Sequence, residues 1–139
     1  NSASAFTGPG IDQWKVTNVK DMNNMFISCP VFNNQNLGNW QRSTAGNIST
    51  TSNVTSMASM FAYSSAFTGA SIHLWNVTNV TTMQGMFYES SAFNNQNLSN
   101  WQRTTPSTSS TSNITNASSM FFKTTALYNA NGTFKKSSA

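Results

Sequence analysis

The residues of this chain that could undergo chemistry are asparagines in Asn-x-Ser/Thr triplets, the acceptor sequence for N-linked glycans. Asn47 and Asn131 are the strongest candidates. Asn47 lies in a polar run that the core does not need, and Asn131 lies in the C-terminal tail. Asn53, Asn79 and Asn113 also stand where an asparagine can cap a short helix, so both roles stay open for them. The remaining candidates are Asn76, Asn97 and Asn116.

A second group of candidates consists of hydroxyl side chains in residues 104–112, where eight serines and threonines surround Pro106. Such a run resembles a mucin-type stalk that carries O-linked glycans. A plain flexible loop is the alternative. The candidate O-glycan acceptors are Thr104, Thr105, Ser107, Thr108, Ser109, Ser110 and Thr111.

Titratable side chains are too scattered for acid–base catalysis, which needs such groups set close together. They are Asp12, Asp21, Glu89 and His73, and none of them recurs in a repeated position. Zinc would require clustered His and Cys ligands, and calcium would require several carboxylate oxygens. We therefore predict that the protein is not an enzyme and has no catalytic, cofactor-binding or metal-binding residues.

The composition points to an uncharged polar surface. Charged residues make up 7% of the chain, against roughly 25% in an ordinary soluble domain. Serine and threonine together occupy 40 positions and asparagine occupies 20, so hydroxyl and amide groups replace charge. A surface with so little charge is either kept soluble by sugars or suited to association.

The same composition excludes several classes of partner. The net charge of +4 comes from scattered basic residues that form no stripe along which a nucleic acid could lie. No stretch approaches the roughly 18 apolar residues of a membrane span. The single cysteine, Cys29, can form no internal disulfide. We interpret it as a small buried apolar group, with a thiol that joins two chains as the rarer alternative.

One repeating pattern places nearly every large apolar side chain. It reads Phe, about eight residues to Trp, then Asn-Val/Ile and Met-x-x-Met-Phe. All four tryptophans, all seven methionines and eight of the ten phenylalanines fall in its columns, and we interpret the methionines as core residues. We predict one solenoid domain over residues 1–139. Its copies lie at about 5–30, 31–65, 66–91 and 92–125, with a partial copy at 126–139.

Short and long copies alternate, because the spacings from Phe to Phe, and finally to Leu127, are 26, 35, 26 and 34 residues. A two-coil unit has therefore been duplicated, which places Trp14 and Trp75 61 positions apart. The extra length of the long copies lies in polar runs at 43–52 and 104–112. We predict that these runs leave the stack as exposed loops on the same side.

Each copy is expected to contain one short helix and one short strand. Val19, Met22, Met25 and Phe26 lie at i, i+3, i+6 and i+7, which is the spacing of one helix face. The stretch before each Trp, such as residues 36–40, is predicted to be a strand that stacks in parallel on its counterparts. The predicted fold class is therefore α/β, a short repeat solenoid of about four coils, each with a short parallel strand and a short helix.

The core motif WNVTNVTTMQGMF of residues 75–87, followed by residues 91–94, resembles the BspA-like surface-protein repeat. That repeat is a unit of about 25 residues of the form W-D-V-S-N-V-T-x-M-x-x-M-F…F-N. The resemblance covers residues 5 to about 128. It implies a leucine-rich-repeat-like solenoid on surface-exposed or secreted proteins, often with adhesive roles, and it brings no catalytic residues. The chain departs from the family after each Trp, where Lys15, Gln41, Asn76 and Gln102 replace the usual Asp.

The chain opens directly into one copy and closes in a fragment of another, without a polar capping segment. Uncapped stacks leave an apolar face and open edges that another chain can extend. A head-to-tail contact of this kind does not close on itself, so it propagates as a fibre. The expected partners are therefore further copies of the same chain, together with covalent glycans.

These observations predict a glycosylated extracellular structural protein that assembles end to end into a filament or surface layer. The expected location is outside the cell or at the cell surface. The alternative function is a cell-surface adhesion or binding module of a bacterial-type repeat protein. A third possibility is ice binding by flat rows of Thr and Asn.

Overall fold

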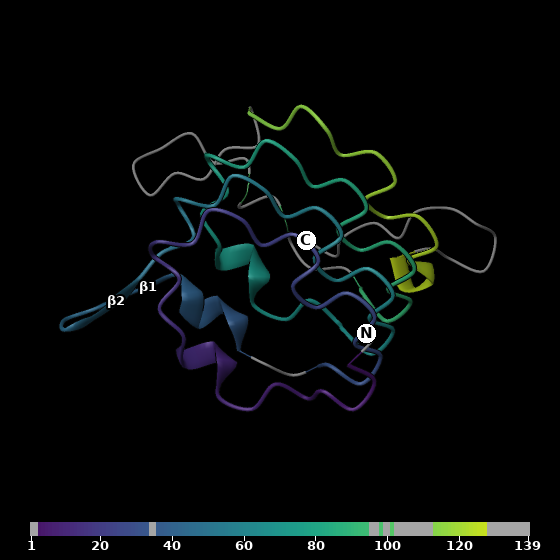
Figure 1. The fold of residues 1–139 in the computed structure, drawn as a ribbon, viewed down its shortest axis with the longest axis horizontal. Helices are drawn as coiled ribbons and strands as arrows, with labels where there is room; N and C mark the ends of the chain where they lie inside the picture. Colours follow the sequence, from purple (N-terminus) through teal and green to yellow (C-terminus); the bar gives the residue numbers. More distant parts are fainter. Residues whose placement is uncertain (1–2, 34–35, 95–97, 99–100, 102–112, 128–139) are drawn as a thin grey trace.

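The chain forms a stack of four coils that follow one another in sequence order (Figure 1). The computed structural model describes residues 3–33, 36–94, 98, 101 and 113–127. We call the copies at 5–30, 31–65, 66–91 and 92–125 coils 1 to 4. Large apolar side chains from all four coils form one continuous core, flanked by Phe6, Met25 and Phe121, which are partly buried.

The segments that lead into Trp14, Trp40 and Trp75 are single turns of 3-10 helix and not the predicted strands. These turns are η1 (Ile11–Gln13), η2 (Leu37–Trp40) and η3 (Ile72–Leu74), and η5 (Thr125–Leu127) follows coil 4. Gly10 and Ser71 precede η1 and η3 in the left-handed conformation, with φ of 76° and 66°. That conformation turns the chain so that the Trp N–H bonds locally to the carbonyl three residues back.

The Met-x-x-Met-Phe segments are rows of overlapping β-turns and not the predicted helices. In coil 2, the N–H groups of Met60 and Ala62 donate to the carbonyl groups of Met57 and Ser59, three residues earlier. Two residues in each segment adopt left-handed backbone conformations, for example Ser59 with φ of 52°. An α-helix cannot include such residues, because it needs negative φ throughout.

Backbone N–H groups that make no hydrogen bond within their own turn segment connect the coils. Every second N–H group in a turn segment donates to a carbonyl group of the next coil. From coil 2 to coil 3 these donors are Met57, Ser59, Phe61 and Tyr63, and their acceptors are Thr82, Gln84, Met86 and Tyr88, with N···O distances of 2.7–3.0 Å. Two hydrogen bonds run in the opposite direction, from Thr81 N–H to the Thr55 carbonyl and from the N–H of Ala92, the first residue after coil 3, to the Ser65 carbonyl.

The predicted α/β fold class is therefore wrong. Within the described ranges, the named strands are only β1 (Arg42–Thr44) and β2 (Asn47–Ser49), which pair antiparallel, and no helix exceeds four residues. Parallel pairing occurs in a different place from the predicted strands, as isolated bridges just before the Met-x-x-Met-Phe segments, which link Asp21 to Ser56, Ser56 to Thr82 and Thr82 to Asn116. The two-turn helix was too short to form without help from its neighbours. Hydrogen bonds to neighbouring coils stabilise repeated turns instead.

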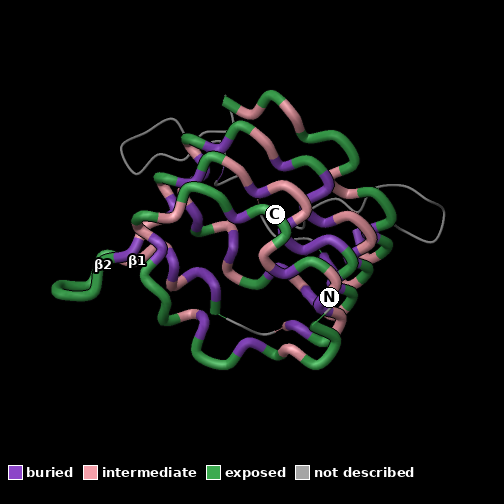
Figure 2. Tube along the Cα trace, in the orientation of Figure 1, coloured by how far each residue is buried: buried purple, intermediate pink, exposed green. Residues whose placement is uncertain are grey.

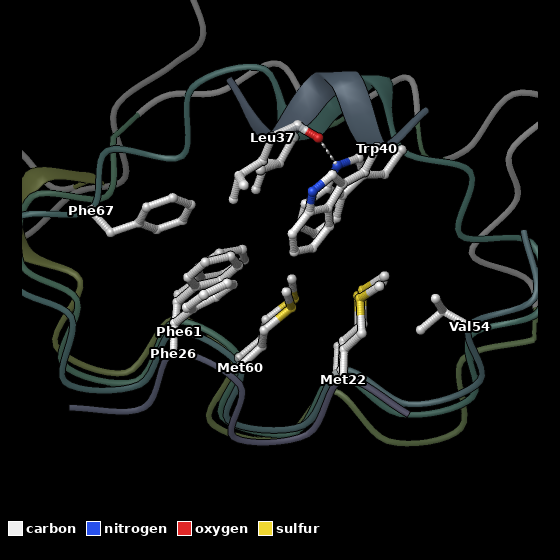
Figure 3. Packing of buried hydrophobic residues seen from close by; sticks show 14 of the residues in the cluster. Met22, Phe26, Leu37, Trp40, Val54, Met60, Phe61 and Phe67 are labelled. Carbon is white, nitrogen blue, oxygen red and sulfur yellow. Dashed lines mark hydrogen bonds between the residues drawn. The ribbon is translucent and has the colours of Figure 1, made fainter. Parts of the chain in front are cut away.

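Aromatic rings stack in columns through the core, and Figure 3 shows them pointing inward from opposite sides of each coil. Trp40 and Trp75 are stacked with ring centroids 5.5 Å apart, and Phe61 lies 5.9 Å from Phe87 in the next coil. The indole N–H of Trp75 donates to the Leu37 carbonyl at 2.7 Å. The methionines lie among these rings, five of them buried and two partly buried, which confirms their predicted role as core residues.

The first long-copy loop is the hairpin of β1 and β2, which projects from the side of the stack (Figure 1). Residues 43–48 are exposed, as predicted for this loop, and Figure 2 shows the exposed tip projecting away from the stack. The rest of the predicted loop is wrong, because Ser49 and Thr51 are fully buried. The second loop, at 104–112, lies outside the described residues. None of the helices in the described part of the chain has the length and apolar character needed to span a membrane.

Candidate functional site

The candidate N-glycan acceptors occupy different environments. Asn47 begins β2 and is exposed, and its side-chain oxygen accepts hydrogen bonds from the Arg42 guanidinium. The side-chain oxygen of Asn76 accepts the N–H of Thr78, and that of Asn116 accepts the N–H of Ser118. Further candidates lie outside the described residues: Asn97, Asn131, Thr104, Thr105, Ser107, Thr108, Ser109, Ser110 and Thr111.

Asn53, Asn79 and Asn113 form an amide ladder that joins the coils. Each side-chain amide nitrogen donates to a backbone carbonyl of the preceding coil, at 2.6 Å from Asn53 to Thr17 and 2.7 Å from Asn79 to Ser52. Asn113 makes the equivalent bond in coil 4. Their position before each turn segment therefore has a structural explanation that differs from helix capping.

The titratable side chains do not come together in one site. His73 belongs to η3 in coil 3, whereas Asp12 lies in η1 and accepts a hydrogen bond from the Asn39 amide. Nowhere in the described ranges do three or more His, Cys, Asp or Glu side chains gather as metal ligands would. Cys29 is buried, as predicted, and burial raises the pKa of its thiol.

The two ends of the stack carry complementary rows of unused backbone groups. In coil 1, the carbonyl groups at the acceptor positions form the head edge, made of Asp21, Asn23, Met25 and Ile27. Among the described residues, the first three accept no hydrogen bond, and the Ile27 carbonyl accepts only the weak thiol donor of Cys29.

In coil 4, the N–H groups at the donor positions form the tail edge. They belong to Ala117, Ser119, Phe121 and Lys123, and none of them has an acceptor within the described part of the chain. A row of N–H groups at one end and a row of carbonyl groups at the other is the arrangement that a further coil would satisfy. Chemically, the ends can therefore bind a segment that carries the same backbone pattern.

Aromatic side chains are exposed at both ends. Trp14 is 49% exposed at the head, although Trp40 and Trp75 in the same column are almost fully buried. Its ring stacks on Trp40 from one side only, at 6.5 Å. At the tail, Phe122 is 47% exposed and stacks on Tyr88. Trp14 remains on the surface because the described residues supply no coil before it.

A hollow of about 370 Å³ opens at the tail. Ala117 stands there in a column that holds methionine in coils 1 to 3, so the coil lacks one long core side chain. The hollow is apolar, since its walls are Met83, Leu98, Trp101, Ile114, Ala117, Met120 and Phe121. If another coil covered this hollow, apolar surface next to the tail edge would become buried, which is favourable.

Sequence reasoning missed the structural role of Arg42. Its guanidinium donates to the carbonyl groups of Gln13 at 3.0 Å, Trp14 at 3.3 Å and Asn39 at 2.6 Å. It therefore joins the base of the hairpin to the 3-10 turn of coil 1. The only available signal was the recurrence of Arg after Trp-Gln in both long copies, at 42 and 103.

A family model described as "Mycoplasma protein of unknown function, DUF285" matches residues 1–110 and, in a second placement, residues 47–139. Overlapping placements are expected of a repeated pattern, because it can be aligned in more than one register. Neither a curated protein nor a solved structure matches the chain. Since the two placements together span the whole sequence, this chain belongs to the DUF285 repeat family.

Proposed function

We propose that this protein is an extracellular structural protein whose copies stack end to end into a filament or surface layer. The observation that carries the proposal is the pairing of a carbonyl row at the head edge with an N–H row at the tail edge. Unused backbone groups favour the addition of another strand-like segment. The exposed rings of Trp14 and Phe122 add apolar surface at the same two ends.

The low charge of the chain supports the same function. Only 7% of its residues are charged, and a single ion pair, between Lys123 and Glu89, occurs among the described residues. Like-charge repulsion between copies is therefore weak, and little of the association should depend on salt.

The experiment is to purify the full chain and measure its size by sedimentation over a wide concentration range, with negative-stain microscopy of the concentrated sample. We expect growing linear assemblies with a repeat of about 20 Å per copy, from four coils spaced about 4.8 Å apart. A monomer at every concentration would reject the proposal.

The proposed glycan coat is tested separately. Asn47 is the best-placed acceptor in the described structure, because it is exposed on the projecting hairpin and its amide nitrogen makes no hydrogen bond to another described residue. Intact mass before and after enzymatic deglycosylation should differ in the natural protein, and Asn47→Gln should remove part of the difference. Equal masses would reject the glycan coat but would not affect the proposal of end-to-end assembly.

An adhesive module of the BspA-like type is the second candidate, favoured by a groove along the side of the stack. The groove has a volume of about 500 Å³ and is lined by amide and hydroxyl side chains with one cation: Lys20, Asn53, Thr55, Asn79, Thr81 and Asn113. Saturable binding of a soluble glycan, weakened by Thr81→Val, would support adhesion. Ice binding needs uniform rows, and Lys20 interrupts the threonine row at coil 1.

A further inference from the structure

We infer that the head edge of one copy docks on the tail edge of a second copy in the register that joins coil 2 to coil 3 within the chain. This inference rests on the proposed end-to-end assembly and adds the residues that meet. Its starting point is the two-coil period. Coil 4 is a long copy like coil 2, and coil 1 is a short copy like coil 3. The contact between chains therefore repeats a contact that the molecule already contains.

The backbone groups at the two ends match in number and direction. The coil 2 to coil 3 contact uses four hydrogen bonds forward and two in reverse. When these bonds are assigned to the equivalent repeat positions at the two ends, the four forward bonds run from the N–H groups of the tail edge to the carbonyl groups of the head edge of the second copy. The two reverse bonds run from the N–H groups of Lys20 and Val31 to the carbonyl groups of Thr115 and Thr125. None of these four groups has a backbone partner among the described residues.

The tryptophan column extends across the same contact. Within the chain, the indole N–H of Trp75 donates to the Leu37 carbonyl, and that of Trp101 donates to the Ile72 carbonyl. Trp14 has no equivalent acceptor in the described structure, because no coil precedes it there. In the inferred register, its indole N–H reaches the Leu98 carbonyl of the second copy, which is the counterpart of Leu37.

A close approach of two coils makes one position of the inferred register sensitive to side-chain size. Gly38 packs so closely on coil 3 that a Cβ placed there would lie 2.8 Å from the Cβ of Ser71. In the inferred contact between chains, Gly10 stands at the repeat position of Ser71. It brings no Cβ to this close approach of two backbones.

One side chain must move for this contact to form. Phe6 stacks beneath Phe32 at 5.9 Å, in the column position that Leu127 fills at the other end of the chain. Two copies in register would place Phe6 and Leu127 in the same space. Leu127 is buried and Ala126 N–H is bonded to the Ser91 carbonyl, whereas Phe6 is only partly buried and its N–H bonds locally to Ala3. Residues 3–6 of the second copy are therefore expected to move aside, so that Leu127 keeps its place in the core.

The direct test is disulfide cross-linking of two variants of the full chain, both carrying Cys29→Ser. Asp21 and Asn116 correspond to the bridge partners Thr82 and Ser56, so Asp21→Cys in one chain should meet Asn116→Cys in another. Their Cα separation of about 5 Å suits a disulfide. A mixture of the two should give a covalent dimer, while neither variant alone and no mixture of Asp21→Cys with Tyr63→Cys should do so.

A steric test uses Gly10. Gly10→Ser should raise the concentration needed for half-assembly about tenfold, because it adds a Cβ where two backbones are inferred to approach closely. The fold tolerates serine there, since Ser71 adopts nearly the same φ. Gly46→Ser is the matched control, because Gly46 also has φ of 76° and open space around it. Phe6→Ala, by contrast, should lower the concentration for half-assembly.

The outcomes separate this inference from the proposed function. Assemblies without the Asp21–Asn116 cross-link, or with no response to Gly10→Ser, would overturn the register and leave end-to-end assembly standing. A cross-link in Asp21→Cys alone would show head-to-head docking and would also overturn it. A chain that stays monomeric in all samples would reject both the inferred register and the proposed end-to-end assembly. The head and tail edges would then be explained as contacts for neighbouring repeats of a longer chain.

Discussion

Coil 1 and coil 3 carry the same pattern 61 positions apart, but their tryptophans have opposite environments. Trp75 is 1% exposed and its indole N–H is bonded to the coil before it, whereas Trp14 is 49% exposed. The residue type and its local turn are the same, since η1 and η3 begin after left-handed residues and are followed by extended tryptophans. The difference teaches that burial in this molecule is set by the presence of a preceding coil and not by the sequence of the coil itself.

The largest expected effect tests this difference in burial. Trp75→Ala should lower the free energy of unfolding by about 3–5 kcal/mol, because it removes a fully buried ring from the core. Trp14→Ala should cost well under half of that in the monomer, since half of its ring is already in water. Denaturant unfolding at a concentration below assembly measures both. Equal losses would mean that Trp14 is more important to the monomer than its exposure indicates.

The next effect concerns Arg42, which connects the hairpin to the turn of coil 1. Arg42→Ala should lower the free energy of unfolding by about 1–3 kcal/mol, because five backbone carbonyl groups lose a charged donor. Arg42→Lys should recover only part of this loss, since an ammonium cannot reach all of these acceptors at once. If the lysine variant were as stable as the natural chain, charge alone would explain the role of Arg42.

A third change makes coil 4 more like coil 3. Ala117→Met restores the long side chain that the column holds elsewhere, and it should raise the free energy of unfolding by roughly 1 kcal/mol by filling the hollow at the tail. Thermal unfolding gives the measurement. Ser119→Met, at an exposed position two residues away, serves as the control and should not stabilise the chain. A loss of stability in Ala117→Met would show that the hollow cannot accept the side chain.

The smallest expected effect concerns the ion pair between coils 3 and 4. Lys123 Nζ lies 3.0 Å from Glu89 Oε1, and this hydrogen bond together with the carboxylate charge raises the pKa of Lys123. The pair therefore stabilises the fold below the ordinary lysine pKa, and its contribution is lost as pH rises through the raised value. In Glu89→Gln, NMR titration should show a lower pKa for Lys123 and a weaker alkaline loss of stability. An unchanged pKa would contradict the assignment.

The repeat columns were predictable because their periodicity leaves few other places for large apolar side chains. Trp40, Phe61 and Met83 could be assigned to the core from spacing alone, and they are buried. The turn structure could not be derived in the same way. The spacing i, i+3, i+7 also fits a row of β-turns, and the left-handed residues include Tyr63 and Glu89, which give no conformational signal.

The candidate site was only partly visible in the sequence. Open ends were expected from the pattern, but the groups that make them complementary are backbone N–H and carbonyl groups, which every residue carries. The sequence predicts glycan acceptors or helix caps at the asparagines, and it does not reveal that Asn53 and Asn79 donate hydrogen bonds to a neighbouring coil. That role depends on which coil lies beside which, and spacing along one copy does not reveal it.

The left-handed residues in the turn segments also determine how the molecule comes apart. Because Ser59 and Tyr63 direct their N–H groups out of their own coil, a coil removed from the stack has no internal way to satisfy them. Unravelling should therefore start at the outermost layers and advance inward one layer at a time, as in a one-dimensional lattice. In deuterated water, the amides between coils 2 and 3 should exchange last. The outward-facing amides of Ala117 and Ser119 should exchange within the first moments.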